Sequence, residues 1–124
     1  MNRMEQLYEA ILAHRGADPG SSRTARFFFR GSEQIGKKLG EETVEVIVAY
    51  LKSDREGAIR ESADVLYHLA VLWAELGVTP SDIWQEMDRR VAMTGLAEEL
   101  SKTKGRRLPA KNAPHGGRDR FSSD

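Results

Sequence analysis

The sequence predicts an all-α protein, a bundle of four or five helices, for a chain of 124 residues. Apolar residues recur at three- and four-residue spacing in four long segments, which is the periodicity of an amphipathic helix. Short breaks rich in glycine, proline and serine separate these segments, and no run has the alternation of a β-strand. A helical domain this small often completes its core by oligomerising, so we expect a homodimer or homotetramer.

The first helix is predicted over residues 2–15, before Gly16. A second helix is expected over residues 32–52 and a third over 54–76, with Ser53 and Glu56 forming a capping box at its start. Thr79, Pro80 and Asp82 predict the start of a fourth helix that ends at Gly95, followed by a short helix over 96–104. Its buried stripe would contain these residues: Ile83, Trp84, Met87 and Val91.

Two acidic pairs lie in residues 36–68, the stretch around which we expect the function to be organised. Glu42 precedes Glu45 by three residues, and Glu61 precedes Asp64 by the same spacing, so each pair occupies one helix face. The short break near Asp54 should make the two helices antiparallel and bring the pairs to similar heights. Four facing carboxylates would hold a hard divalent cation through oxygen ligands, and Mg²⁺ is the expected ion.

The alternative for each acidic pair is a solvated helix face. The neighbouring residues argue against it, because Val44, Val46, Ile47 and Val48 surround the first pair and the run ADVLYHLAVLWAEL surrounds the second. A helix that is apolar on all sides is normally buried, so acids within it need a partner. His68 lies one turn after Asp64 and is interpreted as a core or interface residue rather than a ligand, as are Tyr67 and Trp73.

Basic residues precede the acidic pairs. Lys37 and Lys38 are close enough to Glu42 to meet the phosphates of a substrate, or they could instead form i,i+4 ion pairs with the neighbouring glutamates, worth tenths of a kcal/mol. Glu41 should point about 100° away from Glu42, to an exposed position or one just outside the ligands. Upstream, in residues 16–32, Arg23, Arg26 and Arg30 alternate with Phe27, Phe28 and Phe29. This segment is either a loop and short helical turn with solvated arginines or an anion-binding flap beside the acidic site.

Charge and composition exclude several classes of function. Residues 101–124 carry seven Lys or Arg against two Asp, which leaves the first hundred residues at a net charge of −5. An acidic body is not typical of a nucleic-acid-binding domain. With no cysteine there is neither a disulfide nor thiol chemistry. No signal peptide or long apolar run occurs, so we expect a cytoplasmic protein without a membrane partner. A helical domain is predicted at 1–104 and a basic, disordered tail at 105–124.

The motifs resemble those of the phosphoribosyl-ATP pyrophosphatase family and, more broadly, of the all-α NTP pyrophosphatase superfamily that includes MazG and the dimeric dUTPases. The superfamily pattern EExxE followed by ExxD is matched by the five acids of the central stretch: Glu41, Glu42, Glu45, Glu61 and Asp64. Narrower similarity lies in GKKLGEETVEV, ESADVLYHLAVLWAELGV, TGLAEELSKTK and DPGSSRTARFFFRG. The resemblance covers roughly residues 4–104 and implies a MazG-like bundle.

The resemblance also implies site residues and a reaction. The implied Mg²⁺ ligands are Glu42, Glu45, Glu61 and Asp64. Lys37 and Lys38 would bind phosphate, Thr24 and Arg26 would lie near the substrate, and Glu41 or Glu42 would be the general base. The implied reaction converts phosphoribosyl-ATP to phosphoribosyl-AMP and pyrophosphate, the second step of histidine biosynthesis. Two alternatives stay open: an NTP or dNTP pyrophosphatase that cleans the nucleotide pool, and a non-catalytic helical module that binds a nucleotide or a protein.

Overall fold

The computed structural model describes residues 1–103, and side chains as far as Gly95. In this range the chain forms five α-helices and no strand: α1 (Arg3–His14), α2 (Arg23–Arg30), α3 (Ser32–Leu51), α4 (Arg55–Leu76) and α5 (Pro80–Thr103). The predicted all-α class is confirmed. The chain divides into two compact units, Met1–Glu86 and Met87–Asp124. The predicted tail at 105–124 lies outside the described residues, and the predicted domain boundary stays a prediction.

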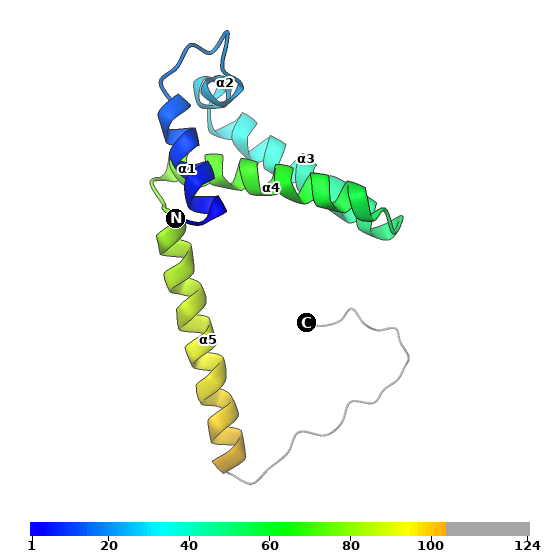
Figure 1. The fold of residues 1–124 in the computed structure, drawn as a ribbon, viewed down its shortest axis with the longest axis vertical. Coiled ribbons are helices and arrows are strands. Elements are labelled where there is room, and N and C mark those ends of the chain that lie inside the picture. Colours follow the sequence, from blue (N-terminus) through cyan, green and yellow to red (C-terminus); the bar gives the residue numbers. More distant parts are fainter. Residues whose placement is uncertain (104–124) are drawn as a thin grey trace. The chain divides into compact units, whose positions relative to one another are not determined.

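In the first unit, α3 and α4 form an antiparallel hairpin, and α1 and α2 pack at one end of it (Figure 1). The core lies at that end and draws on all four helices: Tyr8, Ile11, Phe27, Ile35, Ala70, Val71, Trp73 and Ala74. Within the unit Met1–Glu86, the other end of the hairpin consists of α3 and α4 alone. Two helices cannot cover each other on all sides, so apolar residues at this end stay exposed to solvent.

The exposed apolar residues follow helical stripes. On α3 they are spaced i, i+3, i+4, i+7: Val44, Ile47, Val48 and Leu51, which are 37–74% exposed. On α4, Ile59 and Leu66 are 52% and 44% exposed, seven residues apart. The expectation that neighbouring apolar residues bury the acidic pairs is therefore wrong for the single chain. We call these six residues the apolar stripes.

Of the two helix caps predicted from the sequence, the structure confirms one and contradicts the other. The expected capping box of α5 is confirmed, since the Thr79 N–H donates to Asp82 at 2.9 Å and the Asp82 N–H donates to the Thr79 hydroxyl at 3.2 Å. The capping box predicted at Ser53 is wrong. Ser53 has a left-handed backbone (φ +57°) that reverses the chain, and the next residue, Asp54, caps α4 by accepting from the Gly57 N–H at 2.9 Å.

The predicted end of α5 at Gly95 is also wrong, because the helix continues to Thr103. A glycine inside a helix costs only about 1 kcal/mol relative to alanine, and the following LAEEL consists of strong helix formers. The predicted short helix is thus the last part of α5. Met87 and Val91, expected in a buried stripe, are 53% and 71% exposed. Within the described part of the chain, no helix combines the length and apolar character needed to span a membrane.

Candidate metal and phosphate site

Three of the four predicted ligand carboxylates come together across the hairpin. Glu42 of α3 and Glu61 and Asp64 of α4 each offer an oxygen, and these three oxygens lie within 4.8 Å of one another. Oxygens that share one cation at about 2.1–2.5 Å lie at most about 4–5 Å apart, so the group fits a hard divalent ion. Glu45, one turn along α3, lies outside this group and is exposed.

Neighbouring carboxylates and burial raise the pKa of Glu61 above its usual value. The largest cause is a hydrogen bond between the Glu61 and Glu42 side chains, followed by desolvation and by the charges of Glu42, Asp64 and Glu45. Glu42, Asp64 and Glu45 therefore all act on Glu61, although Glu45 lies outside the group of three. Without a cation, Glu61 holds a proton more readily than an isolated glutamate. A divalent cation would compete with that proton for the same oxygens.

The lysines before the acidic pairs contact the glutamates beside them. Lys38 Nζ lies 3.5 Å from Glu42 and 3.7 Å from Glu41, and Lys37 Nζ lies 3.9 Å from Glu41. The i,i+4 ion pairs that the sequence allowed are thus present. Glu41 is exposed, as expected, and Lys38 is the more enclosed of the two lysines, with 27% of its side chain accessible.

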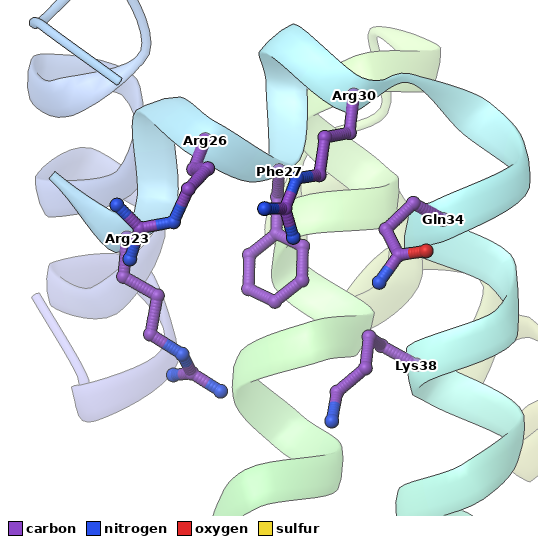
Figure 2. A pocket seen from close by; sticks show the side chains of 6 residues that line it. All are labelled: Arg23, Arg26, Phe27, Arg30, Gln34 and Lys38. Carbon is purple, nitrogen blue, oxygen red and sulfur yellow. The ribbon is translucent and has the colours of Figure 1, made fainter. Parts of the chain in front are cut away.

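A small basic pocket adjoins Lys38. Its volume is about 220 Å³, and six residues of α2 and α3 line it: Arg23, Arg26, Phe27, Arg30, Gln34 and Lys38. Figure 2 shows the polar side chains arriving from α2 on one side and α3 on the other, around the Phe27 ring. We call this cavity the arginine pocket. Its three arginines follow each other at i, i+3 and i+7, so one face of α2 carries them all.

The structure shows a helix within residues 16–32, and anion binding by this segment stays a prediction. Residues 23–30 form a full helix, capped by Ser22, and Phe27 packs into the core. The arginines nevertheless line a cavity instead of pointing only to solvent. Gln34 was not singled out from the sequence. The i,i+4 spacing of Gln34 and Lys38 on one face of α3 was the signal that could have found it.

Thr24 and Arg26 border two different cavities. Arg26 lines the arginine pocket and donates a hydrogen bond to the Pro19 carbonyl at 2.7 Å. Thr24 is hydrogen-bonded to the Tyr67 hydroxyl at 2.6 Å and borders a second cavity of about 370 Å³, which α1 also lines. Arg23 belongs to both cavities, and its guanidinium lies 5.2 Å from the centres of the Phe27 and Tyr67 rings.

His68 is a core residue, as expected. It is 1% exposed and packs edge-to-face against Phe27 and Tyr67, with ring centres 5.1 and 5.0 Å apart. Its Nε2 atom has no hydrogen-bond partner. Burial lowers the pKa of His68, the charges of Arg23 and Lys38 lower it further, and those of Glu42 and Asp64 oppose them. The arginine pocket and the carboxylates are therefore both close enough to act on the same buried ring.

Replacing His68 by Phe should flatten the pH dependence of stability. Because the pKa of His68 in the folded chain lies below the ordinary histidine value of about 6.5, the unfolded chain binds this proton first as the pH falls. The contribution of His68 is present above the unfolded pKa and is lost as the pH falls through the folded one. Phenylalanine keeps the ring contacts and cannot titrate. Melting temperatures measured without divalent metal at about pH 7.5 and about pH 5.5 should differ less in the variant. An equal drop in both proteins would contradict this account.

The fold and the site together define a class. An all-α hairpin with three convergent carboxylates beside a pocket of arginines has the parts of a hydrolase that acts on phosphate anhydrides with a divalent cation. The comparisons with known proteins name the family within this class. Residues 4–91 match the phosphoribosyl-ATP pyrophosphohydrolase family, and the chain belongs to that family.

Individual relatives agree with the family match. The chain is 50% identical over 115 residues to phosphoribosyl-ATP pyrophosphatase 2 of Rhodopseudomonas palustris, covering 93% of this chain and 86% of the relative. It is 50% identical over 111 residues to the protein of the same name from Bradyrhizobium diazoefficiens, covering 90% and 82%. The phosphoribosyl-ATP pyrophosphatase of Paramagnetospirillum magneticum is 46% identical over 101 residues, covering 82% and 93%. The resemblance inferred from the motifs is confirmed, and the chain is a hydrolase of the pyrophosphatase class.

Proposed function

We propose that this protein hydrolyses phosphoribosyl-ATP to phosphoribosyl-AMP and pyrophosphate, with Mg²⁺ held by the carboxylates of α3 and α4. The observation that carries the proposal is the convergence of Glu42, Glu61 and Asp64 next to the arginine pocket in a chain of this family. A triphosphate needs both features, because its oxygens carry charge that a cation and basic side chains must balance. The cytoplasmic location expected from the sequence stays a prediction.

The carboxylates have distinct tasks in this proposal. Glu42, Glu61 and Asp64 hold the cation, and Glu45 joins them by turning its exposed side chain. When bound, the ion neutralises charge on the phosphoryl oxygens and makes water more acidic. A carboxylate then accepts the proton of the attacking water. Glu41 and Glu42 are the candidates, and Glu41 has the advantage that it lies outside the group of three.

The basic and hydroxyl side chains position the substrate. Lys38 lies between the carboxylates and the arginine pocket, so its ammonium can pass from Glu42 to a phosphate oxygen. Lys37 and Arg26 add positive charge for the same phosphates. Thr24, beside the second cavity, would contact the nucleoside end of the substrate.

We further propose that the protein works as a homo-oligomer built through the apolar stripes. Six large apolar residues on one hairpin are 37–74% exposed in the single chain, and they follow the spacing of a helix–helix seam. Exposed apolar residues arranged this way mark an interface, whereas scattered ones do not. A second copy would cover them with an equivalent surface, as two-fold symmetry requires.

The purified protein should release pyrophosphate from phosphoribosyl-ATP in the presence of Mg²⁺, and chelation of the metal should stop the reaction. The assay compares phosphoribosyl-ATP with ATP, GTP, dUTP and dCTP at equal concentration. Preference for one of the common nucleotides would indicate a pyrophosphatase that cleans the nucleotide pool by the same chemistry. Absence of turnover with every substrate would refute the enzyme and leave a binding module.

A further inference from the structure

We propose that the arginine pocket binds the β- and γ-phosphates of the substrate and, after cleavage, the pyrophosphate product. This inference rests on the proposed function, because it assigns one part of the substrate to one part of that site. The ligand class is a pyrophosphate group, and the residues newly assigned to it are Arg23, Arg30 and Gln34.

The charge of the pocket favours an anion. Among the residues that the structure describes, none of the ion pairs involves Arg23, Arg26 or Arg30. Arg26 donates to a carbonyl, Arg23 lies over two aromatic rings, and Arg30 extends over the pocket towards Phe27 (Figure 2). Three guanidinium groups without a carboxylate repel one another, and a multiply charged phosphate would relieve that repulsion. Guanidinium forks also match phosphate oxygens in pairs.

The size of the pocket favours a phosphate or pyrophosphate group over a whole nucleotide. Its volume of about 220 Å³ is below the ~300–1,000 Å³ of cavities that enclose entire drug-sized ligands. The second cavity, on the other side of Arg23, is larger at about 370 Å³ and is lined in part by apolar residues of α1. That cavity suits a base or a sugar, whereas the arginine pocket suits phosphates alone.

The position of the pocket selects which phosphates it holds. Lys38 lines the pocket, and its Nζ atom is 3.5 Å from Glu42, which is a member of the carboxylate group. Lys38 is therefore shared by the pocket and the carboxylate group, which places the two features next to each other. An α-phosphate at the carboxylates thus places its β- and γ-phosphates within reach of the arginines. The 5′-phosphate of the phosphoribosyl arm, at the opposite end of the substrate, is the competing assignment.

The arginines then act on the leaving group. A water oxygen forms a bond to the α-phosphorus and gives its proton to a carboxylate of the site. The bond between the α-phosphorus and the bridging oxygen breaks, and that oxygen leaves with the electron pair as part of pyrophosphate. Negative charge grows on the leaving group during this step, and the arginines stabilise it where it forms.

The test is inhibition by pyrophosphate in the presence of Mg²⁺, compared between wild type, Arg30→Gln and Arg23→Gln. Each variant should bind pyrophosphate about tenfold more weakly or worse, since it loses hydrogen bonds between charged groups. Ribose 5-phosphate, a probe for the phosphoribosyl arm, should inhibit all three proteins equally. The matched control is Arg55→Gln, an exposed arginine at the start of α4 outside the pocket, which should behave as wild type.

The outcomes separate this inference from the proposed function. Titration calorimetry measures pyrophosphate binding without turnover. Weaker binding in both pocket variants therefore supports the assignment of pyrophosphate to the arginine pocket, even if wild type prefers another nucleotide. Normal turnover of phosphoribosyl-ATP with unchanged pyrophosphate binding in both variants would overturn the inference and leave the function intact. Weaker inhibition by ribose 5-phosphate alone would overturn it in favour of the phosphoribosyl arm. Because Arg30 is exposed, its replacement should leave the helical circular dichroism unchanged. Arg30→Lys keeps the positive charge and should therefore bind pyrophosphate more tightly than Arg30→Gln.

Discussion

Replacement of Glu42 by Gln or of Asp64 by Asn should lower the rate of pyrophosphate release by more than ~100-fold. Loss of a residue that only hydrogen-bonds to a metal ligand usually lowers activity by about 10- to 100-fold, and loss of a ligand itself should cost more. Either change removes one charge and one proposed ligand oxygen from a group of three whose oxygens lie within 4.8 Å of one another. The helical circular dichroism should stay near that of wild type, since both substitutions keep the size of the side chain. The measurement is steady-state hydrolysis of phosphoribosyl-ATP at saturating Mg²⁺.

The control for this experiment is Glu56→Gln, which removes an exposed acid paired with Arg55 in the first turn of α4. This variant should keep full activity. Glu45→Gln should have an activity between that of Glu56→Gln and those of Glu42→Gln and Asp64→Asn. Glu45 lies outside the group of three but acts on Glu61 through its charge. Full activity in Glu42→Gln or Asp64→Asn would refute the assignment of the carboxylates to the cation.

Replacement of Ile47 by Lys should separate the proposed homo-oligomer into single chains. Ile47 lies in the middle of the α3 stripe and is 50% exposed in the isolated chain. If a second copy covers it, the substitution buries an ammonium in an apolar contact, at a cost of several kcal/mol. Association should weaken by more than ~100-fold. Light scattering coupled to size-exclusion chromatography measures the mass directly, and the melting temperature of wild type should rise with protein concentration.

Leu76→Lys is the matched control for this change. Leu76 is 71% exposed at the end of α4, outside the apolar stripes, and a lysine near a helix C-terminus is favourable. The Leu76 variant should therefore keep the mass of wild type. If wild type is itself a single chain at micromolar concentration, or if the Ile47 variant retains the oligomer, the stripes do not form the interface.

Most features set by local spacing were predicted correctly from the sequence, although the cap at Ser53 and the helix end at Gly95 were not. The helices follow from apolar periodicity, and the start of α5 follows from the Thr79–Asp82 pair, because a helix and its cap depend on residues three and four apart. The ion pairs of Lys37 and Lys38 with the neighbouring glutamates belong to the same category. The motifs also identified the family that the comparisons confirm.

What the sequence could not supply depends on contacts between helices. The turn after α3 decides that Asp54, not Ser53, caps α4, since one more residue is needed to reverse the chain. Packing of α3 against α4 brings Glu42 to Glu61 and Asp64 and leaves Glu45 outside, which no spacing along one helix determines. The arginine pocket likewise requires α2 to face α3. The sequence by itself determines which residue types are available for this site. The packing of the helices determines which of those residues lie close together.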